Sequence, residues 1–150
     1  MARFESDQGF FEFNLTTDVG KASPNRLDDV ELVRYGYFCL GRNRQVTQIT
    51  PRLRTALQRM RSVGVYGSDL QEVIDAHQQA RGGTQDGKVS VGKAQARKGQ
   101  SLRYDDIHSW IIYILTANMA NNNPDGFPRI DQEIEAGDAI SATVAAMFVR

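Results

Sequence analysis

The sequence predicts a mainly α-helical protein, with a helical core, extra C-terminal helices and a strand or flexible arm at the N-terminus. Apolar residues recur at helical spacing in several separate segments. Glycine, proline and capping residues stand at the ends of these segments. A chain of 150 residues is large enough for one domain with a proper core. We therefore expect an N-terminal arm over residues 1–26 and a single helical domain over residues 27–150.

Near the N-terminus, apolar side chains alternate with polar ones at Phe11, Phe13 and Leu15, which is the pattern of a half-buried strand. Such a strand needs a partner edge, which we expect from the C-terminal tail or from a neighbouring subunit. The same residues also suit a flexible arm over 9–15. Residues 18–25 are rich in turn formers and predict a loop.

The first helix is expected to start at Asp28 or Asp29 and to end at Gly41. Thr50 and Pro51 then predict a second helix, with Thr50 as its cap and Pro51 at the first helical position. The buried face of the second helix is expected to contain Leu53, Leu57 and Met60. Four arginines flank that face: Arg52, Arg54, Arg59 and Arg61.

A glycine turn, Gly64–Gly67, precedes a central helix that we expect to begin near Ser68, with Ser68 or Asp69 as its cap. Gly82–Gly83 can adopt the left-handed geometry that commonly ends a helix. Asp86–Gly87 predicts a second turn directly afterwards. One face of the central helix collects Leu70, Val73, Ile74 and His77.

Residues 88–101 contain few bulky side chains and predict an exposed loop with a short strand at Lys88–Val91. The most apolar helix is predicted over Tyr104–Asn121, capped by Asp105 or Asp106. Its buried side is expected to contain Ile107, Trp110, Ile111, Ile114, Leu115 and Asn118. The tail predicts an acidic helix over 128–136 and a final apolar helix over 140–149.

The central stretch contains three short motifs: G-V-Y-G at Gly64–Gly67, L-x-x-x-I-x-x-x-Q at Leu70–Gln78, and D-G-K-V-S-V at Asp86–Val91. Together they resemble the peptidoglycan-binding-like domain family, whose members are small three-helix modules. The similarity covers residues 27–92, with the basic second helix as an insertion. The sequence departs from the family pattern at Arg34, Val63 and His77, where glutamine, aspartate and an aromatic residue are usual.

The resemblance implies a site for cell-wall glycan beside the glycine turn. In that site Tyr66 would stack on a sugar face, while Gln78 and Asp86 would form hydrogen bonds with hydroxyl or amide groups. A component of a cell-wall hydrolase is a more distant implication of the same family.

The residue pattern predicts no catalytic, metal or cofactor site. Neither histidine has a second histidine or a cysteine near it at the spacing of a zinc site. His77 lies on an apolar helix face, where a packed or hydrogen-bonded core histidine is expected. Cys39 is the single cysteine and lies in an aromatic-rich helix, which predicts a buried, inert thiol. We therefore expect a protein that is not an enzyme.

Charge is segregated along the chain, although the formal net charge is zero. Between Arg42 and Ser68 there are six arginines and no acid, whereas the stretch from Asp125 to Asp138 has five acids and one arginine. Opposed surfaces of this kind suit an electrostatic contact between copies. Three of the acids fit an acidic helix surface more simply than a glycosidase pair in a cleft: Asp131, Glu133 and Glu135.

These observations favour a structural subunit that self-associates through its basic and acidic surfaces and its N-terminal arm, as in a filament or an injection apparatus. The predicted assembly residues are Phe11, Phe13, Arg52, Arg54, Arg59, Arg61, Asp131, Glu133 and Glu135. A glycan-binding module of the cell wall is the alternative. Nucleic-acid binding is disfavoured because the arginines form no one-sided row and the isoelectric point is about 6.7.

The sequence contains no apolar run near the roughly 20 residues that a membrane span needs. Acids interrupt the apolar residues at the N-terminus, a pattern that differs from a secretory signal. We therefore expect synthesis in the cytoplasm. The final location stays open and includes export or an extracellular or phage-like assembly.

Overall fold

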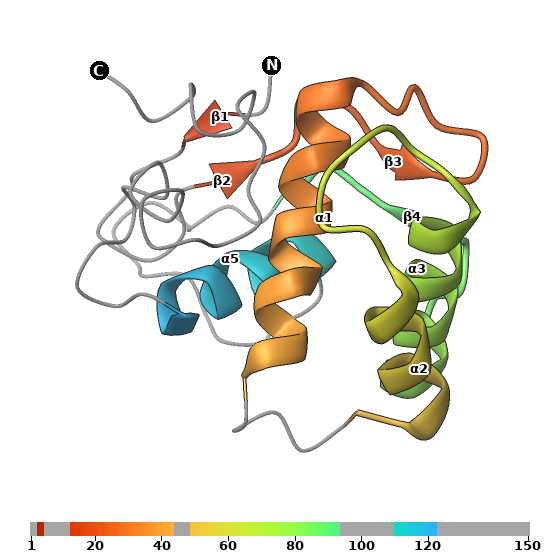
Figure 1. Cartoon of the computed structure of the whole chain (residues 1–150). Helices are drawn as coiled ribbons and strands as arrows, with labels where there is room; N and C mark the ends of the chain where they lie inside the picture. Colours follow the sequence, from red (N-terminus) through yellow and green to blue (C-terminus); the bar gives the residue numbers. More distant parts are fainter. Residues whose placement is uncertain (1–2, 5–12, 44–48, 94–109, 123–150) are drawn as a thin grey trace.

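The computed structural model describes residues 3–4, 13–43, 49–93 and 110–122, and within these ranges the protein is mainly helical, as predicted (Figure 1). The described helices are α1 (Leu27–Arg42), α2 (Pro51–Arg59), α3 (Ser68–Arg81) and α5 (Ile111–Asn122). In Figure 1, α1 runs through the middle of the described fold, with α5 on one side and α2 and α3 on the other. None of these helices is both long and apolar enough to cross a membrane.

Two pairs of short antiparallel strands accompany the helices. Strand β2 (Phe13–Asn14) pairs with β1 (Arg3–Phe4) of the same chain, whereas the prediction expected the tail or a neighbouring subunit as its partner. Strand β3 (Val19–Gly20) pairs with β4 (Lys88–Val89). The prediction of a loop over residues 18–25 therefore missed a strand, although Lys88–Val89 confirms the strand expected after the second turn. Phe11 lies outside the described residues.

Helix α1 begins one residue earlier than predicted and has Arg26 as its N-cap residue. Asp29 is fully buried and accepts hydrogen bonds from the backbone N–H groups of Thr16 and Thr17 at 2.9 and 3.1 Å. The Asp29 carboxylate therefore holds the preceding segment of the chain and does not cap its own helix. From Asp29 to Leu40, α1 is buried almost all round.

The predicted starts of α2 and α3 and the predicted end of α3 are confirmed. The Thr50 hydroxyl accepts from the Leu53 N–H at 3.2 Å, which is the expected N-cap of α2. Gly82 ends α3 with a φ of 66°. The predicted cap of α3 is wrong: Gly67, and not Ser68 or Asp69, is the cap residue, and no side chain caps the helix. Asp69 does not cap α3 because its carboxylate pairs with Arg34.

Helix α5 begins at Ile111, whereas the prediction started it near Tyr104; residues 104–109 lie outside the described ranges. Leu115 is buried, as predicted, and Ile114 is only partly buried. Burial extends almost all round the helix, because four further side chains are buried that the predicted stripe omits: Ile112, Tyr113, Thr116 and Met119. The predicted acidic and final helices also lie outside the described residues.

Two glycines of α1 give a matched test of how tightly the helices pack. A Cβ added at Gly36 would lie 2.6 Å from the Cβ of Leu115 in α5, whereas one added at Gly41 would meet only Leu57, at 3.8 Å. We expect Gly36→Ala to lower the free energy of unfolding by about 1–3 kcal/mol through overpacking. Gly41→Ala should raise it by about 0.5–1 kcal/mol, because alanine is the better helix former. Urea unfolding measures both, and shifts of the same sign would contradict this packing.

Candidate functional site

The glycine turn before α3 is held by Arg34, whose side chain is fully buried. Its guanidinium pairs with both carboxylate oxygens of Asp69 at 2.9 and 3.0 Å. The remaining N–H groups donate to three backbone carbonyls of the turn, those of Arg61, Gly64 and Val65. Because one side chain satisfies a carboxylate and three carbonyls, Arg34 determines the shape of the turn.

Hydrogen bonds and burial shift the pKa values of two carboxyl groups at this turn. The hydrogen bonds from Arg34 hold the pKa of Asp69 well below its usual range, and the Arg61 N–H, at 3.0 Å, adds to the effect. Burial raises the pKa of the neighbouring Glu31, which also accepts a hydrogen bond from the backbone of Gly64. Two side chains of α1, the acidic Glu31 and the basic Arg34, thus hold the turn. The Asp69 carboxylate and the Arg34 guanidinium form an ion pair with each other, so the role of this pair is structural.

Two glutamines of α3 hold the second turn. The Gln71 amide donates to the Gly87 carbonyl at 2.9 Å, and the Gln78 carbonyl accepts from the Gly87 N–H at 2.8 Å. The Tyr66 hydroxyl donates to the other end of Gln71. A network therefore runs from the glycine turn to the second turn. The sequence-based prediction missed Gln71, although it lies seven residues before Gln78 and so on the same helix face.

The structure brings two of the three predicted glycan-binding residues together. The Gln78 amide donates to Asp86 at 3.0 Å and to the Lys88 carbonyl at 2.9 Å, so both ends of this buried side chain are used within the turn. Tyr66 is connected to Gln78 indirectly, through hydrogen bonds that involve Gln71 and Gly87. Of the three residues, Asp86 is the one whose side chain is exposed.

A polar cavity of about 410 Å³ lies beside Asp86. Its wall includes Trp110, and its charged lining includes Arg81 and Lys88. An indole ring beside hydrogen-bonding groups is suited to a sugar, whose two faces are apolar and whose edge is polar. This cavity is the feature of the described structure that best fits the predicted glycan site.

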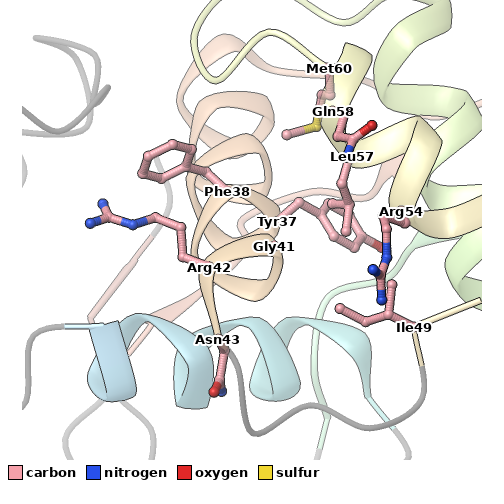
Figure 2. Close-up of a pocket in the computed structure, with 10 residues that line it drawn as sticks. All are labelled: Tyr37, Phe38, Gly41, Arg42, Asn43, Ile49, Arg54, Leu57, Gln58 and Met60. Atoms are coloured by element: carbon pink, nitrogen blue, oxygen red, sulfur yellow. The ribbon is translucent and has the colours of Figure 1, made fainter.

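A second, more apolar groove of about 530 Å³ lies between α1 and α2 (Figure 2). Gly41 lies between its two sides, and Figure 2 shows Leu57 and Arg54 on one side and Arg42 on the other. The Arg42 guanidinium lies 5.2 Å from the centre of the Phe38 ring, a distance suited to a cation–π contact. Further lining comes from Tyr37, Asn43, Ile49, Gln58 and Met60.

The four predicted assembly arginines divide into two pairs. Arg52 makes a two-pronged contact with Glu72 at 2.8 and 3.1 Å, and Arg61 lies 3.6 Å from Asp69. Arg54 and Arg59 are exposed, and neither has an ion-pair partner among the described residues. The other predicted assembly positions, Asp131, Glu133 and Glu135, lie outside the described ranges, and of Phe13 only the backbone is described.

The side chains expected to be inert are packed as predicted. Cys39 is fully buried, and His77 is buried with its Nδ1 atom 3.0 Å from the Tyr37 hydroxyl. Across the described ranges, no group of three histidine, cysteine or acidic side chains could hold a metal ion.

Comparison with known proteins adds no relative: no family model matches the chain, and neither a curated protein nor a solved structure is significantly similar to it. The peptidoglycan-binding-like resemblance therefore stays a prediction that depends on the three motifs alone.

Proposed function

We propose that the protein is a non-enzymatic assembly subunit, built on a peptidoglycan-binding-like core, that self-associates through its basic and acidic surfaces. This proposal rests on the difference between two pairs of arginines in and just after α2. Arg52 and Arg61 are engaged within the fold, whereas Arg54 and Arg59 extend from the surface without an acidic partner among the described residues. Exposed charge of this kind supports contacts with another molecule.

The complementary surface is the acidic stretch from Asp125 to Asp138. Two different patches on one chain make a head-to-tail contact, which closes into a ring or continues as a filament. The N-terminal arm with Phe11 and Phe13 would add apolar contacts to the same interface. Because the net charge of the chain is zero, copies have no overall repulsion to overcome.

The test is the mass of the purified protein by light scattering at low and high salt. We expect a large species that dissociates in salt, because exposed ion pairs are screened. Arg54→Gln/Arg59→Gln should dissociate at lower salt than wild type. Arg52→Gln/Arg61→Gln removes the same charge from arginines that already have partners and should behave like wild type. A wild-type monomer at both salt concentrations would contradict self-association.

Glycan binding is the second candidate, and the polar cavity beside Asp86 and Trp110 favours it. A monomer that is retained on purified sacculi would support this function in place of assembly. Retention should then fall in Asp86→Asn, because this side chain lines the cavity. It should also fall in Tyr66→Ala, because the Tyr66 hydroxyl donates to Gln71, which in turn holds the carbonyl of Gly87 next to Asp86.

A further inference from the structure

The groove between α1 and α2 combines an apolar interior with cations at its edges (Figure 2). Leu57 and Met60 are only partly buried where they line it, so both side chains have surface left to cover. Arg42 and Arg54 come from different helices and lie on different sides of the groove. The chemistry that fits such a groove is a segment with an apolar face and flanking carboxylates.

The chain contains such a segment after α5. Residues 130–135 read I-D-Q-E-I-E, and as a helix they place Ile130 and Ile134 on one face. Asp131 and Glu135 have the same four-residue spacing and flank that face. Between the end of α5 and this segment the sequence contains Pro124, Gly126 and Pro128, which predict a loop.

We propose that the α1–α2 groove of one copy binds residues 130–135 of a second copy. Ile130 and Ile134 fill the apolar interior, and the flanking acids face Arg42 and Arg54. This inference rests on the proposed self-association and identifies the two surfaces that meet. A groove filled by the tail of its own chain would leave no site for a neighbour, so assembly requires the contact between copies.

Two variants each disrupt one of the two surfaces, the groove or the 130–135 segment, and neither removes a charge. Gly41→Leu extends a side chain into the groove from an exposed helical position, where a Cβ would make only ordinary contacts. Ile130→Ser/Ile134→Ser removes the apolar face of the segment. Each variant alone should self-associate roughly 100-fold more weakly, since two isoleucine side chains lose their burial. Gly41→Ala is the matched control and should associate like wild type, and circular dichroism checks that each variant is folded.

Mixing the two variants gives the decisive result. The intact segment of Gly41→Leu fits the intact groove of the serine variant, so the mixture should form a 1:1 dimer that cannot grow, detected by light scattering. A mixture that stays monomeric would overturn the inference. Undiminished association of Gly41→Leu would also overturn it while leaving the proposed self-association standing. A monomeric wild type would instead overturn the self-association itself, including the case in which the groove is filled by its own chain.

Discussion

Replacing Arg34 by methionine is expected to lower the free energy of unfolding by about 3–5 kcal/mol, the cost of removing one partner from a buried ion pair. Methionine fills part of the space but leaves Asp69 without its main partner. It also leaves the carbonyls of Arg61, Gly64 and Val65 without the N–H groups that they accept from. A small domain has a total stability of about 5–15 kcal/mol, so this one change removes a large part of it.

Arg52→Met is the matched control for Arg34→Met. Arg52 also makes two contacts with a carboxylate, that of Glu72, but both side chains are nearly half exposed, at 44% and 49%. Water and salt screen such a pair, so we expect the free energy of unfolding to change little. Arg34→Lys keeps the charge but lacks the planar guanidinium that makes two hydrogen bonds with one carboxylate. Its free energy of unfolding should therefore lie between those of wild type and Arg34→Met. Equal losses in urea unfolding for Arg34→Met and Arg52→Met would contradict the role of burial.

The sequence predicts the helices well wherever their limits depend on local chemistry. Thr50 and Pro51 mark the start of α2 because a cap and a fixed φ act within one turn of the chain. Gly82 marks the end of α3 because only glycine adopts a left-handed φ without strain. These signals need no knowledge of the rest of the fold.

Predictions failed where a side chain is used by a distant part of the chain. Asp69 has the sequence position of a helix cap, yet Arg34, 35 residues away, takes its carboxylate. Strand β3 was missed because a two-residue strand has no detectable alternation, and its partner β4 lies about 70 residues further on (19 to 89). Such pairings depend on the assembled fold and leave no periodic pattern in the sequence.

For the candidate sites, too, local motifs could be predicted from the sequence and long-range contacts could not. Gln78 and Asp86 were predicted as site residues because each belongs to one of the short motifs that resemble the family. The sequence could not show that their hydrogen bonds are used within the turn. The groove between α1 and α2 was not predicted at all. Its depth depends on how two helices pack around Gly41, and the sequence shows only that a glycine and several arginines are present.

Stability should fall as the pH drops from about 6.5 to about 4, and His77 is the expected cause. Burial, with a smaller effect of the Arg81 charge, lowers the pKa of His77 to about 4, against 6.5 for an exposed imidazole. Above pH 6.5 the His77 ring is neutral in both the folded and the unfolded protein, so it does not change the free energy of unfolding. Between the two values the unfolded chain binds a proton that the folded protein excludes, so each unit of pH costs up to about 1.4 kcal/mol and the whole window about 3 kcal/mol.

The contact with Tyr37 supplies the structural reason for this dependence. Burial raises the pKa of Tyr37, so its hydroxyl keeps its proton. A neutral imidazole can accept a hydrogen bond from that hydroxyl at Nδ1, whereas a protonated ring cannot. His77→Gln removes the titration, so the difference between wild-type and variant unfolding free energies, measured from pH 7 to pH 4, isolates this group from the other acids and bases. Asp69 does not interfere, because its lowered pKa contributes equally to wild type and to the variant and cancels in the difference. If this difference stays constant from pH 7 to pH 4, His77 is not the buried neutral imidazole that the structure shows. If wild type loses more unfolding free energy than the variant over this range, the Tyr37–His77 pair is the acid-sensitive contact between α1 and α3.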